Sequence, residues 1–308
     1  MKEGTGQQPS PNIESHNTTM ILIADSGSTK TDWAVLDGGK TLKTIKTGGA
    51  NPFFLTEEEM AQAVREDLVP ELKTLTGQDA GSTGKPAVDH VFFYGAGCTP
   101  EKQPVVERVL KSCITVNGRC EVASDLLAAA RALCGHRPGI ACILGTGSNS
   151  CEYDGTSITH NVPTLGFILG DEGGGARLGA TFLREVLRGH LSKEVTEAWQ
   201  QRYHLTQGDV LDRVYHQKLP NQYLASFVPF IDEHLNDRQV RQMVVDHFDE
   251  FAGRILSNYA TCRTEPIHFI GSLAFFNREP LKEALHNHGM RLGTIIKAPM
   301  EGLIDFHK

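Results

Sequence analysis

Two apolar runs, each ended by a turn of small residues, mark corresponding points in the two halves of the chain. The first run is residues 20–24, which stops at Asp25-Ser26-Gly27-Ser28-Thr29 and resumes at residues 33–36. The second is residues 140–144, which stops at Gly145-Thr146-Gly147-Ser148-Asn149. An apolar run that stops at small residues before the chain continues predicts two paired strands joined by a tight turn. Residues 23–29 and 143–149 align at an offset of 120 residues, so the pattern predicts the same hairpin twice.

Around these hairpins the pattern predicts further strands and helices. A third strand is expected at residues 41–47, and the capping box from Thr56 to Glu59 opens a helix whose apolar positions Met60, Val64 and Leu68 are helix-spaced. Pro70 is expected to kink or end that helix. Strands are expected at 88–94, 120–123 and 267–270, helices at 126–133, 177–188, 193–203, 207–217, 238–261 and 279–287, and a short apolar tail at the end. Strands mixed with helices in this way predict an α/β protein.

Glycine is abundant and unevenly placed. The chain has 308 residues, of which 31 are Gly and 14 are Pro, and 11 of the glycines fall between Gly135 and Gly179. The glycines follow no G-X-Y period, which excludes a collagen-like protein, and the length predicts two domains. A dense glycine window indicates backbone that approaches a ligand closely.

Charge and cysteine content exclude several classes of protein. A net charge of −7 without basic runs argues against nucleic-acid binding. The sequence has no apolar stretch of about 18 residues and no apolar segment near its start, so we expect no membrane span and no signal peptide. The expectation is a cytoplasmic protein with a disordered leader over residues 1–19. Its seven cysteines form no C-x-x-C pair and mostly lie in apolar runs, which predicts reduced packing residues and not a metal site.

The small-residue turns have the composition of phosphate-binding turns. Phosphate groups are held by backbone N–H donors where the chain bends tightly, and side chains would block the approach. Two such turns, one in each half, could grip a triphosphate from both sides. Asp25 stands at the first turn, and a carboxylate beside phosphate is tolerated when a divalent cation lies between them, although it is also an ordinary turn residue. Neither the P-loop pattern nor G-x-G-x-x-G after a strand occurs, so the site is of neither kind.

Two further segments carry candidate chemistry. Asp125 lies where the strand 120–123 gives way to a helix, and ligands of α/β proteins bind beyond the carboxyl ends of strands. The alternative is that Ser124 and Asp125 only cap the helix. The second segment is Gly166 to Gly175, where Asp171 and Glu172 are flanked by glycines at a helix entrance. It can present acceptors to a polyhydroxylated ligand.

Taken together, these segments resemble the sugar kinase and actin-like ATPase superfamily, and within it the BadF/BadG/BcrA/BcrD ATPase family, whose closest characterised relatives are N-acetylglucosamine kinases. Four motifs occur in the family's order: the two phosphate turns, residues 170–173 for the sugar loop and Phe269-Ile270-Gly271-Ser272 for adenosine. The resemblance implies an α/β fold of duplicated ribonuclease H-like (actin-like ATPase) domains, each a central mixed sheet flanked by helices, with the active-site cleft between them. The domains are expected at 20–122 and 123–296, the second with a helical insertion, and the tail at about 297–308 is expected to return to the first.

The resemblance also implies roles for individual residues. Asp125 corresponds to the catalytic base and Asp25 to the residue that holds Mg²⁺. The implied contacts to ATP are Gly27, Ser28, Thr29, Lys30, Gly145, Thr146, Gly147, Gly271 and Ser272, and those to the sugar are Asn51, Ser148, Asn149, Gly166, Asp171 and Glu172. The expected reaction is transfer of phosphate from Mg·ATP to an amino sugar, N-acetylglucosamine at its 6-hydroxyl first. The oligomeric state, a homodimer included, is left open.

One departure and one competing function qualify this reading. Animal-type N-acetylglucosamine kinases carry Gly-Trp-Gly ahead of the sugar loop, whereas this chain has Leu165-Gly166, so the substrate could instead be glucosamine or N-acetylmuramic acid. The same family name covers ATPases that activate radical acyl-CoA dehydratases through an iron–sulfur cluster. Those need exposed cysteines, and Cys98 is the one expected to be least buried.

Overall fold

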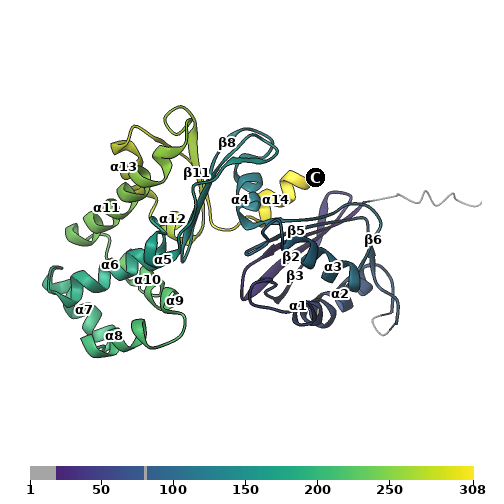
Figure 1. Ribbon diagram of the computed structural model, residues 1–308, viewed down its shortest axis with the longest axis horizontal. Helices are drawn as coiled ribbons and strands as arrows, with labels where there is room; N and C mark the ends of the chain where they lie inside the picture. The colour runs from purple at the N-terminus through teal and green to yellow at the C-terminus, as the bar shows by residue number, and fades with distance from the viewer. Residues whose placement is uncertain (1–18, 80–81) are drawn as a thin grey trace, which may run out of the picture.

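A computed structural model describes residues 19–79 and 82–308 of the protein. The leader expected at residues 1–19 lies, except for Thr19, outside the described residues. The described chain forms two lobes, each built around a five-stranded sheet, with two helices between them (Figure 1).

The first lobe contains the first of the two predicted hairpins. Its sheet has the order β3-β2-β1-β5-β7, in which β1 to β3 are antiparallel and β5 and β7 run parallel to β1. Its strands are β1 (Met20–Ser26), β2 (Lys30–Asp37), β3 (Lys40–Gly48), β5 (His90–Gly95) and β7 (Cys120–Ser124). Its helices are α1 (Glu57–Ala63), the π-helical turn η1 (Val64–Leu68), α2 (Val69–Leu75) and α3 (Gln103–Cys113), and the short strands β4 (Ala87–Val88) and β6 (Thr115–Val116) pair beside them.

The second lobe repeats the first sheet. Its order is β10-β9-β8-β11-β12, again with an antiparallel three-stranded part and two further parallel strands. Its strands are β8 (Gly139–Leu144), β9 (Ser148–Tyr153), β10 (Ile158–His160), β11 (Pro266–Ile270) and β12 (Arg291–Ile296). Because the order and directions of the strands are the same in both lobes, the predicted duplication of an α/β, ribonuclease H-like unit is confirmed.

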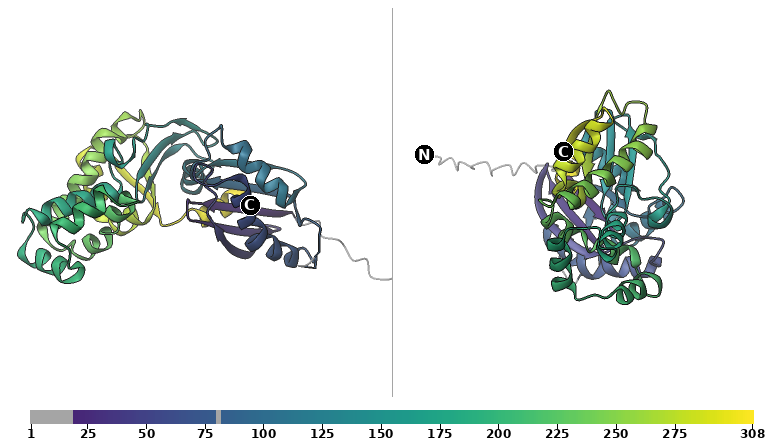
Figure 2. Two further views of the ribbon diagram at one scale, coloured as in Figure 1. Left: turned by 60° about the horizontal axis from the view of Figure 1, so that its bottom comes forward. Right: turned by 90° about the vertical axis from the view of Figure 1, so that its left-hand side faces the viewer.

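The remaining helices make the second lobe larger than the first (Figure 2). They are α5 (Gly166–Leu169), α6 (Gly175–Leu187), α7 (Lys193–Tyr203), α8 (Gln207–Tyr215), α9 (Pro220–Ala225), α10 (Val228–Glu233), α11 (Arg238–Arg254), the 3₁₀ turn η2 (Leu256–Asn258), α12 (Ser272–Phe276) and α13 (Arg278–Asn287). The helices α6 to α10 all lie between β10 and β11 in the chain. This segment buries aromatic residues such as Phe182, Phe227 and Phe230 in one core with β8 and β11.

Two helices join the lobes. α4 (Asp125–Cys134) follows β7, and α14 (Met300–His307) follows β12, so each continues from the last strand of one sheet. Leu126 and Leu133 of α4 pack with residues of the second sheet, whereas Ala128 packs with Leu303 of α14 and residues of the first. Leu303 is fully buried, and the end of the chain therefore lies on the first lobe (Figure 1).

Four predicted elements differ from the structure. The helix expected at 238–261 ends at Arg254, because Asn258 donates its side-chain amide to the carbonyls of Arg254 and Ile255 (2.6 and 3.0 Å). The apolar tail contains β12 and α14, since residues 291–296 complete a sheet edge that no local pattern announces. Pro70 does not end the helical run, which continues from α1 through the π-helical turn η1 into α2; it lies in the first turn of α2, directly after the change of hydrogen-bond pattern in η1. The loop expected at 166–175 begins with the short helix α5.

Candidate active site

The first phosphate turn joins β1 to β2. Gly27 donates its N–H to the carbonyl of Lys30 (2.8 Å), and the buried hydroxyl of Ser26 is 2.8 Å from that of Thr31. Ser28, Thr29 and Lys30 are exposed at the tip. The Lys30 ammonium binds Asp32 at 2.7 Å, so its side chain is tied to the neighbouring strand position. The tip of this turn is therefore exposed to solvent, whereas its base at Ser26 and Thr31 is buried.

The second phosphate turn joins β8 to β9 and is held from behind by α6. Gly145 donates to the carbonyl of Gly147 (3.0 Å) and accepts from Gly175 (2.8 Å), while the carbonyl of Thr146 accepts from Ala176 (2.8 Å). Gly175 begins α6, a helix of 13 residues, and the N-terminus of a helix favours anionic groups. The structure thus brings the second turn and a helix N-terminus to one place.

Three carboxylates gather below the first turn. Asp25 is at the end of β1 and pairs in register with Asp32 on β2, and Asp125 is the first residue of α4. Burial raises the pKa of Asp25 to about 6, with further contributions from the negative charges of Asp32 and Asp125. Burial also raises the pKa of Asp125, against the opposing backbone hydrogen bond of Leu126. The register places Asp25 level with Tyr94 of β5, and Tyr94 level with Ala123 of β7, so Asp25 and Asp125 lie at the same end of the sheet.

Asp125 is not needed as the helix cap. The hydroxyl of Ser124 accepts the N–H of Leu127 (3.2 Å) and caps α4. Ser124 therefore performs the capping, and the Asp125 carboxylate, which meets the backbone N–H of Leu126 at the start of the same helix, is not required for it.

The donor chemistry fits a hard divalent cation. Within residues 19–79 and 82–308 no three His, Cys, Asp or Glu side chains form a closed metal cage. Mg²⁺ commonly takes one or two carboxylates and completes its shell with water and substrate phosphates. Asp25, a largely buried carboxylate beside a phosphate-type turn, has the chemistry for such a partial site.

The proposed sugar residues lie on both lobes. On the first, Asn51 is buried; its amide donates to the Ser28 hydroxyl (3.0 Å) and its carbonyl accepts from Phe53 N–H (3.0 Å). On the second, Ser148 donates to the carbonyl of Glu172 (2.6 Å), and Asp171 has a left-handed φ of 54° and lies against Gly147. A small hollow between these elements is lined by Ser148, Asn149, Asp171 and Glu172, among others.

Residues 165–169 do not form a wall around that hollow. Leu165 is 60% exposed, and Ile168 and Leu169 of α5 are more exposed still. Gly166, at the start of α5, contributes a carbonyl that accepts from Gly170 (2.8 Å). Gly166 is thus brought to the base of the sugar loop. Leu165, Ile168 and Leu169 are exposed to solvent, whereas Phe167 packs against the core of the second lobe.

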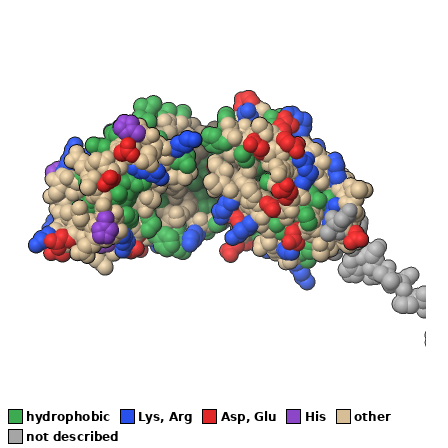
Figure 3. All heavy atoms as spheres, turned by 90° about the horizontal axis from the view of Figure 1, so that it is seen from below, with side chains coloured by type: hydrophobic (Ala, Val, Ile, Leu, Met, Phe, Trp, Pro, Cys, Tyr) green, Lys and Arg blue, Asp and Glu red, His purple; other side chains and the backbone are tan. Residues whose placement is uncertain are grey.

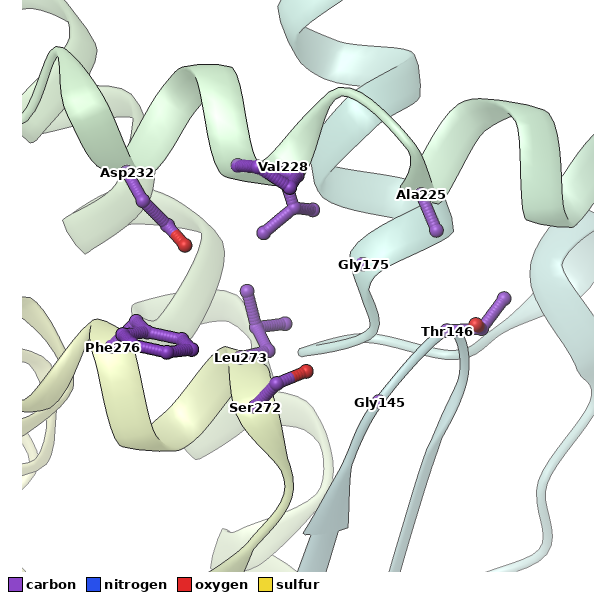
Figure 4. A pocket seen from close by; sticks show the side chains of 10 residues that line it. Gly145, Thr146, Gly175, Ala225, Val228, Asp232, Ser272, Leu273 and Phe276 are labelled. Carbon is purple, nitrogen blue, oxygen red and sulfur yellow. The ribbon is translucent and has the colours of Figure 1, made fainter. Parts of the chain in front are cut away.

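A cavity of about 370 Å³ opens beside the second turn (Figure 4). Gly145, Thr146, Gly175 and Ser272 line one part, and the rest is lined by Ala225, Val228, Pro229, Asp232, Leu273 and Phe276. Gly271, which precedes α12, has φ 119°, and a Cβ there would overlap the Leu144 carbonyl, so only glycine fits. The second turn and the predicted adenosine motif therefore share one cavity.

The lining residues from α9 and α10 were missed by the sequence reading. They come from a helical insertion without a recognised motif, and only its packing against α12 places them at the cavity. The sequence offers a local signal only for Val228 and Asp232: they are one helical turn apart, so a helix there would place both on one face.

Cys98 was expected to be the least buried cysteine, and this is wrong. It is 1% exposed, because it lies in the core of the first lobe against Gly95, and burial raises the pKa of its thiol to about 12. All seven cysteines are free, and only Cys120 is partly exposed. The described surface offers no set of cysteine ligands. None of the described helices has the length and apolar character to cross a membrane.

The hollow between the lobes is visible from below in the space-filling view (Figure 3). The first turn lies on one lobe, and the second turn, the sugar loop and the cavity lie on the other. Each lobe therefore carries one of the two turns that the sequence predicts for phosphate.

Comparison with solved structures identifies the relatives of this chain. A candidate N-acetylglucosamine kinase from Porphyromonas gingivalis is 45% identical, with a TM-score of 0.85 over 94% of this chain and 98% of the other. A second candidate N-acetylglucosamine kinase, from Chromobacterium violaceum, has a TM-score of 0.69 at 19% identity over 94% and 99% of the two chains. A ROK hexokinase from Thermus thermophilus shares the fold at a TM-score of 0.54 and 15% identity, covering 94% of this chain and 97% of that one.

No protein-family model matches the chain, and no curated protein sequence matches it. Membership of the BadF/BadG/BcrA/BcrD family accordingly stays a prediction. The fold, and the likeness to the candidate N-acetylglucosamine kinases, do not depend on it. At this identity and coverage, the chain belongs to the same family as the candidate N-acetylglucosamine kinase of Porphyromonas gingivalis, within the sugar kinase and actin-like ATPase fold.

Proposed function

We propose that the protein is an ATP-dependent amino-sugar kinase that transfers the γ-phosphoryl group to N-acetylglucosamine, at its 6-hydroxyl. The observation that carries the proposal is the partly buried carboxylate of Asp125, which begins α4 at the end of the sheet where Asp25 and the first phosphate turn also lie. A base at that point, with phosphate turns on both lobes, fits phosphoryl transfer to an alcohol.

The reaction follows from these positions. The sugar hydroxyl oxygen forms a bond to the γ-phosphorus, the bond between that phosphorus and the β,γ-bridging oxygen breaks, and ADP leaves. Asp125 accepts the hydroxyl proton, and the raised pKa of its carboxyl makes it a stronger base than an exposed aspartate. Mg²⁺, held by Asp25, would supply neutralisation of the phosphate charge.

In this proposal, backbone groups of the chain provide most of the stabilisation of the phosphate charge. The tips of the two turns are proposed to present N–H groups to the phosphates, because the N–H groups of Gly27 and Gly145 themselves close the turns on the carbonyls of Lys30 and Gly147. The N-terminus of α6 is proposed to add its dipole behind the second turn. Asn51 and Asp171 are proposed to orient the sugar, one from each lobe. The large cavity is proposed to take the adenosine, with Gly271 and Ser272 at its edge.

The decisive test is Asp125→Asn. We expect it to lower kcat by about 10²–10⁴-fold, because a positioned base contributes that much, while sugar binding persists. The measurements are coupled ADP release for turnover and calorimetry for sugar binding. The matched control is Asp212→Asn, which alters an exposed aspartate on α8 and should leave both unchanged. A variant at position 125 with nearly unaltered kcat would remove Asp125 from the reaction.

The substrate is tested by the same assay with a panel of sugars. N-acetylglucosamine, glucosamine, N-acetylmannosamine, N-acetylmuramic acid and glucose differ in their acyl, amino, ether and hydroxyl groups. We expect the highest kcat/KM for N-acetylglucosamine. Turnover highest for glucosamine would show that the acetyl group is not recognised, and turnover of none of the five would contradict the sugar kinase proposal.

A further inference from the structure

We propose that Asp232 selects the nucleobase: its carboxylate accepts a hydrogen bond from the 6-amino group of adenine and disfavours purines with a 6-oxo group. The inference rests on the proposed function in one respect, since it takes the cavity beside Gly145 as the nucleotide site. It adds a specificity residue that none of the sequence motifs contains.

Asp232 is the only charged residue among those that line the cavity in the described chain. It lies on α10 one turn after Val228, so both side chains stand on the same face of that helix. Figure 4 shows the Asp232 side chain directed into the space between α10 and α12, where Leu273 and Phe276 also project. In this part of the cavity, where the other side chains are mainly apolar, the Asp232 carboxylate is therefore the one strong hydrogen-bond acceptor.

The carboxylate is held in place by a fully buried residue. The side-chain amide of Asn277 donates to Oδ1 of Asp232 (2.7 Å) and to the Leu273 carbonyl (3.0 Å). This contact fixes one oxygen and leaves the other for a ligand. Burial raises the pKa of Asp232 to about 6, so at pH 7.5 the group is still mostly ionised and can only accept hydrogen bonds.

The neighbouring ring indicates a base and not a phosphate at this end. Phe276 is 53% exposed although it lines the cavity, and the Lys297 ammonium lies 5.3 Å from its ring centroid. An aromatic face beside an apolar cavity is a surface on which a purine can stack. Asp232 and Phe276 lie together at the side of the cavity away from Gly145 and Thr146, where the phosphates would be bound (Figure 4).

Purines differ at the position that a single acceptor can read. Adenine carries an amino group at C6, which donates, whereas hypoxanthine and guanine carry a carbonyl oxygen there, which accepts. A carboxylate aligned with the C6 substituent gains a hydrogen bond with the first and faces an unpaired oxygen with the others. A carboxylate that reached N1 would instead accept from the N1–H of hypoxanthine or guanine, and the preference would then be reversed. Such discrimination is strong because the wrong base leaves a buried polar group without a hydrogen-bond partner.

The test compares ATP with ITP, whose bases differ at C6 and at the adjacent N1, which accepts in adenine and carries a proton in hypoxanthine, at saturating N-acetylglucosamine. For the unaltered protein we expect kcat/KM to favour ATP on the order of tenfold to hundredfold. In Asp232→Asn the amide can donate to a 6-oxo group, so the preference should fall to within about threefold. The replacement can still accept from Asn277, and its melting temperature checks the fold. The control is Glu233→Gln, which alters an exposed carboxylate on the same helix and should leave the preference unchanged.

Other outcomes overturn the inference. Equal use of ATP and ITP, a preference for GTP, or an ATP preference that survives Asp232→Asn would each do so. If the variant instead alters the preference for ATP over 2′-deoxy-ATP alone, Asp232 binds the ribose and the inference is wrong. Absence of phosphoryl transfer from every nucleotide would contradict the proposed function, and calorimetry with ATP and ITP in the absence of sugar would still test Asp232.

Discussion

His247 of α11 shows at the scale of one residue how burial determines protonation. It is 6% exposed, and its Nε2 has no hydrogen-bond partner among the described residues. Burial lowers its pKa from 6.5 to about 4, although a hydrogen bond to the backbone of Gly173 in the sugar loop opposes the shift. The imidazole is therefore neutral at pH 7, behind the loop that carries Asp171.

This shift predicts a specific acid sensitivity. Below pH 6.5 the unfolded state binds a proton at residue 247 that the folded state does not, so stability falls as pH falls from about 6.5 to 4. The contribution is on the order of 3 kcal/mol. His247→Asn should make the free energy of unfolding, measured with urea at several pH values, less dependent on pH in that window. His216→Asn, which alters an exposed histidine on the surface, is the control; equal slopes for the two variants would contradict the prediction.

At the scale of elements, α6 matters because it links the second turn to the helical insertion. It packs across α9 at Gly179, where a Cβ would overlap the Leu224 carbonyl oxygen. Only the absence of a side chain allows the two helices to approach so closely. The second phosphate turn, the sugar loop and one side of the cavity beside Gly145 all depend on the position of this helix.

Gly179→Ala is therefore expected to destabilise the protein by about 1–3 kcal/mol, because the clash is with backbone and cannot be relieved by a rotamer change. Gly208→Ala is the matched comparison, since Gly208 also lies in a helix but a Cβ there meets only the Thr206 hydroxyl at 3.6 Å. It should stabilise by about 0.4–1 kcal/mol. Chemical denaturation of both variants measures the difference, and equal stabilities would show that α6 and α9 can separate without cost.

At the scale of the whole molecule, the two lobes meet through α4 and α14. Arg131 of α4 donates to the Tyr94 hydroxyl and to Glu121 (both 2.6 Å), and the Tyr94 hydroxyl is 2.7 Å from Nε2 of His307 on α14. This largely buried network fixes the contact between α4 and α14, while a hollow separates the two lobes in the space-filling view (Figure 3). Movement of the lobes is thus expected to occur about this contact.

Binding of both substrates should close the cleft, since each lobe carries one phosphate turn and one proposed sugar contact. We expect N-acetylglucosamine with Mg·ATP to reduce the radius of gyration measured by small-angle X-ray scattering. Asp125→Asn is the suitable form, because it holds the unreacted pair. Mg·ATP added without sugar is the control and should produce less closure. Scattering profiles that do not change with both ligands would contradict closure.

The features readable from sequence are those that depend on a few consecutive residues. The hairpins at 20–36 and 139–153 follow from apolar runs broken by small residues, and Ser124 caps α4 by a rule of local chemistry. The carboxylates Asp25 and Asp125 could be singled out because strand ends face the crevice of an α/β sheet. The effect of Asp125 on the pKa of Asp25 could not be predicted, because it depends on the distance between residues that are 100 positions apart in the chain.

The sequence alone thus determined the duplicated α/β unit, its turns and the acids beside them, because backbone conformation and capping act over one or two turns of chain. Only the tertiary structure decided that Cys98 is buried and that β12 completes the second sheet. The return of the tail to the first lobe was already an expectation from the family resemblance, whereas the helix α14 that makes this contact was not. The tertiary structure alone brought Asp232 and Phe276 to one cavity from two different helices. Such contacts arise from the fit of whole faces of helices and sheets against one another, and that fit has no signature in any short stretch of residues.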